Sequence, residues 1–326
     1  MKSKVLTRVI FMTILIAGFI GTNHAQDISK ASEAFNNALA LQTSDPMAAI
    51  TSVKSCLEIC DQIGEDADDL KMMAGLKLPE LYFNVGNGYA SAKKYTAAIP
   101  AYLEAIKVAQ QYETPEVERK AKKMLPQLHY MIGGGHYKKK EYEEAASAMQ
   151  QAIEIDPDYA KAYYYIGLVR KKQKDLPAFE AIMDKGLVAA KNSRDNNYKK
   201  RINKSAASTF LSAGAKLTTG GKPADAIPFL EKSLKYDQKN SELFFYIATA
   251  QNELKQWDKA IEAANRGLLV EKDEADKKAK HYFNLGTSFK GKGDKNAACE
   301  AYKNALYGQF KENAQYEIEH TLKCNK

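Results

Sequence analysis

The residues with the clearest chemical pattern lie near the C-terminal end. Gly286 and Gly291 stand five residues apart and Lys292 follows, which is how a phosphate-binding loop begins. Such a loop needs Ser or Thr after the lysine to hold Mg²⁺, but Gly293 occupies that position. A β-strand would also have to precede the loop, and none is indicated there. We therefore set the nucleotide-binding interpretation aside.

Histidine and cysteine give no better catalytic candidate. No histidine beyond position 25 has a partner at the spacing of a metal site or a Ser-His-Asp triad: His129, His136, His281 and His320 are scattered. Cys56 and Cys60 are four residues apart in an expected helix, too far for an unstrained disulfide, and we expect two buried small side chains. The sequence thus predicts no catalytic residue, no metal and no cofactor, and a protein that is not an enzyme.

A repeated spacing of small and aromatic residues organises the chain. Gly86 is followed at intervals of 3, 12, 16 and 19 residues by Tyr89, Ala98, Tyr102 and Ala105, and the same set returns from Gly286. Weaker copies begin at Gly133, Gly167, Gly214 and Ala248. A fixed period of this kind is typical of stacked helix pairs, each of which needs its neighbours to bury its apolar face.

The recurring glycines have a physical reason. A glycine inside a helix costs roughly 1 kcal/mol relative to alanine, so its return at one phase of the repeat indicates a packing benefit. We therefore expect two helix backbones to approach closely at Gly86, Gly133, Gly167, Gly214 and Gly286.

This pattern resembles the tetratricopeptide repeat. Tyr95, Tyr142 and Trp257 also fall at the family's aromatic position, three residues before the first alanine of the second helix. The resemblance covers Leu81 to about Leu306, although Phe179 and Ser233 stand where the family prefers alanine. It implies an all-α fold: a right-handed α-solenoid of about six to seven helix-turn-helix units with a C-terminal capping helix.

The chain divides into four predicted segments: a signal peptide at 1–25, a degenerate repeat-like unit at 26–69, the repeat array at 70–309, and a capping helix with tail at 310–326. Successive packing positions are 34 residues apart twice, 38 once, and 47 from Gly86 to Gly133 and from Gly167 to Gly214. We expect the excess of 13 to be shared by the two helices around 112–115 and around 192–197. Such insertions mark a binding edge or an ancestral duplication.

The N-terminus reads as an export signal. Lys2, Lys4 and Arg8 precede an apolar run at 9–21, and Ala25 offers a cleavage site before Gln26. An uncleaved anchor is the alternative. The resemblance and the signal together imply the secreted or periplasmic bacterial type, at the periplasm or outer-membrane periphery of a Gram-negative bacterium. There, Cys299 and Cys324 can form a disulfide, since the latter follows the terminal helix that should pack on the former's helix.

The charge is mildly basic. The formal net charge of +8 falls to about +5 without residues 1–25, well short of what nucleic-acid binding requires. One basic cluster stands out: Arg194, Lys199, Lys200, Arg201 and Lys204. It is either a solvated helix-turn-helix tip or a peripheral contact for an acidic partner or an anionic membrane.

In the tetratricopeptide family the first helices line a concave groove. On the matching positions this sequence places aromatic rings and several Asn side chains: Phe83, Asn84, Asn87, Tyr130, Tyr164, Tyr165, Phe245, Tyr246, Phe283 and Asn284. Such a groove suits a peptide or helix of a protein partner and implies a scaffold or adaptor. Three alternatives stay open: the rings are inter-helix core, the face binds glycans, or a second copy of the chain fills it.

Overall fold

The computed structural model describes residues 22–272 and 274–324, which form two compact units that divide between Asp156 and Pro157. The predicted signal segment lies outside the described residues up to position 21. No described helix is long and apolar enough to cross a membrane.

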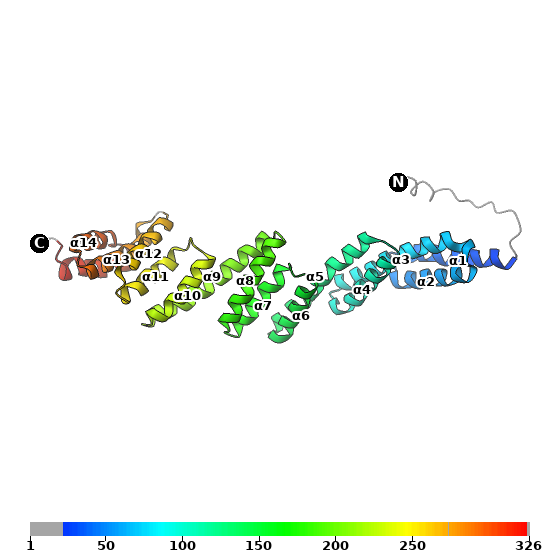
Figure 1. Ribbon diagram of the computed structural model, residues 1–326, viewed down its shortest axis with the longest axis horizontal. Helices are drawn as coiled ribbons and strands as arrows, with labels where there is room; N and C mark the ends of the chain where they lie inside the picture. Colours follow the sequence, from blue (N-terminus) through cyan, green and yellow to red (C-terminus); the bar gives the residue numbers. More distant parts are fainter. Residues whose placement is uncertain (1–21, 273, 325–326) are drawn as a thin grey trace. The chain divides into compact units, whose positions relative to one another are not determined.

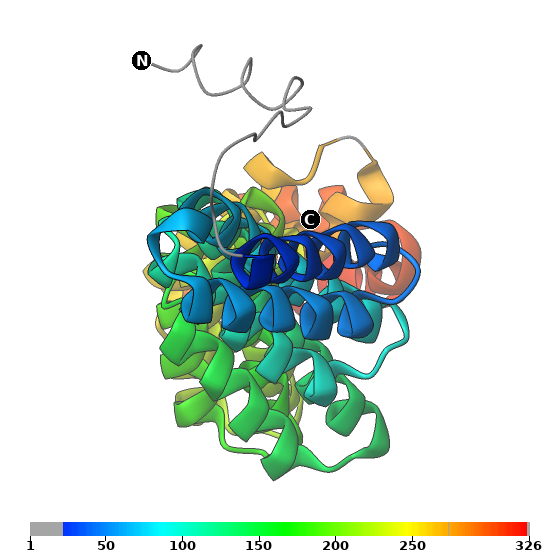
Figure 2. The same ribbon diagram turned by 90° about the vertical axis from the view of Figure 1, so that its right-hand side faces the viewer.

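The first unit consists of three helix pairs. Its elements are α1 (Thr22–Leu41), α2 (Pro46–Ile63), the 3₁₀ turn η1 (Glu65–Ala67), α3 (Asp68–Ser91), α4 (Tyr95–Gln111), α5 (Pro115–Lys139) and α6 (Tyr142–Ile155). α1 packs on α2, α3 on α4, and α5 on α6 (Figure 1). Figure 2 shows α1, in dark blue, running alongside α2. The pair α1 and α2 lies in the segment that the sequence predicts as a degenerate repeat-like unit.

The second unit contains four more pairs. Its helices are α7 (Ala160–Lys172), α8 (Leu176–Asn192), α9 (Asn196–Thr219), α10 (Pro223–Tyr236), α11 (Ser241–Glu253), α12 (Trp257–Val270), α13 (Ala275–Lys292) and α14 (Lys295–Asn304). Consecutive helices pair as in the first unit. Residues 22–272 and 274–324 contain no β-strand, and the all-α class with about seven repeat units is confirmed.

The repeating glycines lie where two helices of a pair cross. A Cβ atom built on Gly86 would lie 2.8 Å from the Tyr102 ring, and one on Gly286 would lie 2.6 Å from the Tyr302 ring. Both tyrosine rings are fully buried. At Gly133, Gly167 and Gly214 the obstructing side chain is likewise the residue sixteen positions later. The predicted close approach is therefore confirmed.

The turn within each repeat pair is equally regular. Seven residues after each packing position the chain has a positive φ angle, at Lys93, Lys140, Lys174, Gly221, Lys255 and Gly293. A left-handed residue ends a helix because it redirects the chain and lets the following N–H groups reach the last carbonyls. After Lys93, for example, the N–H of Lys94 donates to the Tyr89 carbonyl at 2.9 Å.

Equal sharing of the extra residues is the prediction that fails. The helices α5 and α9 have 25 and 24 residues, against 13 in α7 and in α11. The preceding helices α4 and α8 have 17, only slightly more than the 14 of α6 and α10. The insertion therefore lengthens mainly the first helix of the following pair. Proline at the first position of α5 and the Asp195 side chain, which caps α9, fix the early starts.

The C-terminal segment is the predicted cap and is built from three consecutive short helical stretches. It comprises the 3₁₀ turn η2 (Gly308–Phe310), α15 (Lys311–Tyr316) and the π-helical turn η3 (Glu317–Thr321). Ala314 and Ile318 are buried against Tyr302 and Ala305, so the segment closes the apolar end of the last pair. A disulfide joins Cys324 to Cys299 on α14.

Candidate partner-binding surface

Five aromatic residues of the predicted groove lie on first helices, three positions before the packing position, and are half-buried: Phe83, Tyr130, Tyr164, Phe245 and Phe283. The rings pack edge-on against the pair core. Phe83 lies 5.5 Å from Tyr102 and Phe283 lies 5.4 Å from Tyr302 between ring centroids. Each of these two rings therefore contributes to the core and still keeps part of its area at the surface. We call the side of the first helices that carries these rings the first-helix face.

Two of the predicted Asn side chains belong to the framework. Asn87 accepts a hydrogen bond from the Tyr102 hydroxyl at 2.7 Å, which satisfies the phenol inside the repeat. Asn284 is 5 % exposed, and its amide nitrogen donates to the Phe245 carbonyl at 3.2 Å. In this structure the Asn284 amide therefore serves the packing of α11 against α13. Asn84 remains half-buried on α3.

On α7 the predicted tyrosines form an aromatic and cationic cluster with α9. Tyr164 lies 5.5 Å from Tyr165 and 5.7 Å from Tyr198 between ring centroids. The Arg201 guanidinium lies 4.8 Å from the Tyr164 ring centre and donates to the Tyr198 hydroxyl at 3.2 Å. Cation–π contact of this kind holds the arginine on the rings. Arg201 and Tyr164 therefore partner each other.

In the last two pairs the first-helix face is occupied by the chain itself. The Phe310 ring, from η2, lies 5.9 Å from Phe245 and 5.4 Å from Phe283. Tyr246 packs on Phe245 with the ring centres 5.1 Å apart, and burial raises the pKa of its hydroxyl. An ion pair between Lys290 and Glu317, at 2.6 Å, holds the same segment in place.

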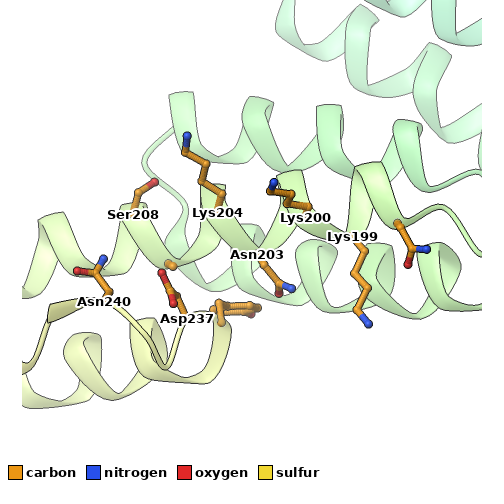
Figure 3. A pocket seen from close by; sticks show the side chains of 10 residues that line it. Lys199, Lys200, Asn203, Lys204, Ser208, Asp237 and Asn240 are labelled. Carbon is orange, nitrogen blue, oxygen red and sulfur yellow. The ribbon is translucent and has the colours of Figure 1, made fainter. Parts of the chain in front are cut away.

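The lysine side chains of the predicted basic cluster point to different sides of α9. Figure 3 shows Lys200 and Lys204 on one side of the helix and Lys199 on the other. All three line an open hollow of about 610 Å³ that reaches Asp237 at the end of α10 and Asn240 just before α11. Arg194 is exposed in the turn before α9. Of the predicted cluster, Lys199, Lys200 and Lys204 line this hollow, and Arg194 lies outside it.

Two basic residues that the sequence analysis missed occupy equivalent places on α5. Lys123 lies ten residues before the packing glycine Gly133, as Lys204 lies ten before Gly214. Arg119 and Lys200 each lie fourteen before. The shared offsets from the packing glycines are the signal that could have found them. All four side chains are exposed.

A buried Ser-His-Glu cluster also escaped the sequence analysis. The Ser241 hydroxyl donates to Glu271 at 2.5 Å and lies 2.8 Å from Nε2 of His281, which is fully buried. In a catalytic triad the carboxylate bonds the histidine, but Nδ1 of His281 has no hydrogen-bond partner. The cluster therefore links α11, α12 and α13 rather than activating a nucleophile. In the described ranges no three His, Cys, Asp or Glu side chains could hold a metal ion.

Family models match four stretches of the chain. A model described as "TPR repeat" matches 136–174, and two described as "Tetratricopeptide repeat" match 217–279 and both 79–112 and 279–307. No curated protein matches the sequence.

Solved structures that resemble this chain include two proteins, YrrB and MamA. One is "YrrB: a TPR protein with an unusual peptide-binding site", with 19 % identity over 61 % of this chain and 89 % of that chain, at a TM-score of 0.33. Another is MamA, with 16 % identity over 60 % and 95 %, at 0.34. A MamA segment from Desulfovibrio magneticus RS-1 has 19 % identity over 58 % and 96 %, at 0.33.

Proposed function

We propose that this chain, which carries tetratricopeptide repeats, is a non-enzymatic scaffold that binds a peptide or helical segment of a protein partner along the first-helix face. Tetratricopeptide repeats are protein-interaction modules, and the family models place them in both compact units. The partner would be a separate protein, and the first-helix face is the surface on which we place it.

The observation that carries this proposal is the position of Phe310. Its ring comes from a segment outside the helix pairs and lies against Phe245 and Phe283, which occupy the same repeat position on neighbouring first helices. The face thus accepts an aromatic side chain from a non-repeat segment. Aromatic anchors bury large areas at small entropic cost, which is how peptides gain affinity for such surfaces.

We further propose that the protein acts in the cell envelope of a Gram-negative bacterium. The basic and apolar pattern of residues 1–25 supports export. The disulfide between Cys299 and Cys324 is consistent with an oxidising compartment, where such bonds persist.

Two leucines of similar exposure allow a matched test of the binding face. Leu76 on α3 is 46 % exposed and lies seven residues before Phe83, on the same side of the helix. Leu103 on α4, a second helix, is 50 % exposed. We expect Leu76→Asp to abolish capture of a protein partner from envelope extract, while Leu103→Asp retains it, and both variants should keep the wild-type circular dichroism.

Other outcomes would replace the proposal. Equal capture by the two variants would contradict binding at the first-helix face. Retention of glycans instead of protein, lost on Leu76→Asp, would establish the glycan-binding alternative. A wild-type chain that forms dimers, with only the Leu76→Asp variant monomeric, would show that a second copy occupies the face.

A further inference from the structure

Three first helices are long enough to extend the first-helix face well beyond the aromatic positions. α3, α5 and α9 have 24 or 25 residues. Positions 14, 10 and 3 residues before each packing glycine are separated by about one and two helical turns and therefore share one side of the helix. We call these positions the extension stripe. They are Met72, Leu76 and Phe83 on α3, Arg119, Lys123 and Tyr130 on α5, and Lys200, Lys204 and Leu211 on α9.

In the first unit an apolar stripe and a basic stripe are neighbours. α3 and α5 contact each other as consecutive first helices. Met72 and Leu76 are 58 % and 46 % exposed and lie one helical turn apart, so together they form an apolar strip on α3. Arg119 and Lys123 are exposed on the adjoining helix. The surface therefore presents apolar area on one side and positive charge on the other.

The charged side chains on the α5 stripe form no ion pair in the described ranges, whereas the two lysines beside the stripe do. Lys120 pairs with Glu116 at 3.0 Å, and Lys122 pairs with Glu118 at 2.7 Å. Within the described ranges no carboxylate comes within ion-pair distance of Arg119 or Lys123. Glu116 and Glu118 thus neutralise Lys120 and Lys122, and the stripe itself keeps its positive charge.

The α9 stripe shows the same arrangement in the second unit. Lys200 and Lys204 lie together on one side of α9 (Figure 3), and neither forms an ion pair in the part of the chain that the structure describes. Asp237 lines the same hollow but its carboxylate accepts from the Lys239 backbone N–H at 2.9 Å. Neighbouring Arg201 is engaged by the Tyr164 and Tyr198 rings.

We propose that the extension stripes bind an acidic, amphipathic segment of the partner protein. Its carboxylates would meet Arg119 and Lys123, and its apolar side chains would cover Met72 and Leu76. A separate acidic stretch of the partner would meet Lys200 and Lys204 on α9. The proposal rests on the proposed scaffold function and specifies the partner's chemistry. A protein segment is favoured over an anionic membrane because the positive side chains on α5 lie beside the exposed apolar side chains on α3, an arrangement that matches the two faces of one amphipathic helix.

A labelled synthetic peptide tests the stripe directly. The probe is an 18-residue helix former with Phe and Leu on one face and Glu on the other, and its companion has Gln in place of every Glu. The test variant of the full chain carries Arg119→Glu and Lys123→Glu. The control carries Lys120→Glu and Lys122→Glu, which changes the net charge equally on the same helix but off the stripe. Circular dichroism and melting of both variants establish that they fold.

We expect the acidic probe to bind the wild-type chain, with affinity falling as salt rises. The test variant should weaken binding at least about tenfold, and the control less than about threefold. Equal loss in both variants would show attraction by net charge alone and overturn the proposal. Failure of the acidic probe to bind would also overturn the proposal. Equal binding of the acidic probe and its Gln companion would overturn the proposed acidic chemistry but would leave the scaffold function standing. Binding of the wild type to phosphatidylglycerol vesicles, lost in the test variant, would assign the stripe to a membrane instead.

Discussion

Two adjacent glycines on α5 should respond in opposite directions when they are changed to alanine. Gly133 is a packing glycine, and a Cβ there would lie 2.9 Å from the Ala145 carbonyl oxygen and 2.9 Å from the Met149 methyl group. Gly134 has nothing within 4 Å of the position of its Cβ. The pair therefore separates helix propensity from helix packing at the same place in the fold.

The expected magnitudes follow from these two effects. Alanine in place of a helical glycine stabilises by about 1 kcal/mol, so Gly134→Ala should raise the free energy of unfolding by that order. In Gly133→Ala the new methyl group meets a backbone oxygen that cannot swing aside. Overpacking of this kind costs about 1–3 kcal/mol, so after the propensity gain of about 1 kcal/mol the variant should be less stable by up to about 2 kcal/mol.

Urea denaturation followed by circular dichroism measures both changes. The account requires the midpoint to fall for Gly133→Ala and to rise for Gly134→Ala, with unchanged slopes. Midpoints that move in the same direction would refute the claim that close helix approach requires glycine at the packing positions of the repeats. Gly135→Ala, also without neighbours near its Cβ position, repeats the control.

Further predictions concern the second unit. Burial lowers the pKa of His281 to about 4 from its usual value of about 6.5. The neutral, buried ring therefore contributes to the free energy of unfolding fully above pH 6.5, and this contribution is lost as the pH falls toward 4. The unfolding free energy should therefore drop by about 2 kcal/mol from pH 7 to pH 5, and by clearly less in His281→Asn. Cys324→Ser removes a cross-link between positions 25 residues apart and should destabilise the C-terminal segment by about 3 kcal/mol. Amide exchange should then become faster across Lys311–Thr321 only, and unchanged exchange there would contradict this. Phe310→Ala should expose Phe245 and Phe283 and increase the binding of a hydrophobic dye, and equal dye binding would show that another side chain covers these rings.

The repeat pairs could be predicted from sequence because their determinants are local and periodic. Each packing glycine faces the residue sixteen positions later, and each left-handed turn follows seven positions later. The starts of α5 and α9 were also visible, since Pro115 and Asp195 are helix-start signals. The equal division of the insertions failed because these signals place most of the extra residues in the first helix of the following pair.

The details of the candidate surface depended on tertiary contacts that no repeat pattern contains. Phe310 reaches Phe245 across 65 positions of sequence, and its segment does not belong to the repeat. Asn284 has the residue type of a binding position, yet the close approach of α11 and α13 turns its amide inward. Phe83 and Phe283 are both core and surface, because each of these half-buried rings packs by its edge on a buried tyrosine.

Site-specific cross-linking tests the central claim most directly. A photoreactive amino acid placed at Leu76 on the first-helix face, and separately at Leu103 on α4, would be activated in the full chain bound to its captured partner. Cross-links from position 76 to an acidic segment of the partner, with none from position 103, are the predicted result. Cross-links that form from position 103 and not from position 76 would place the partner on the second helices and contradict the account.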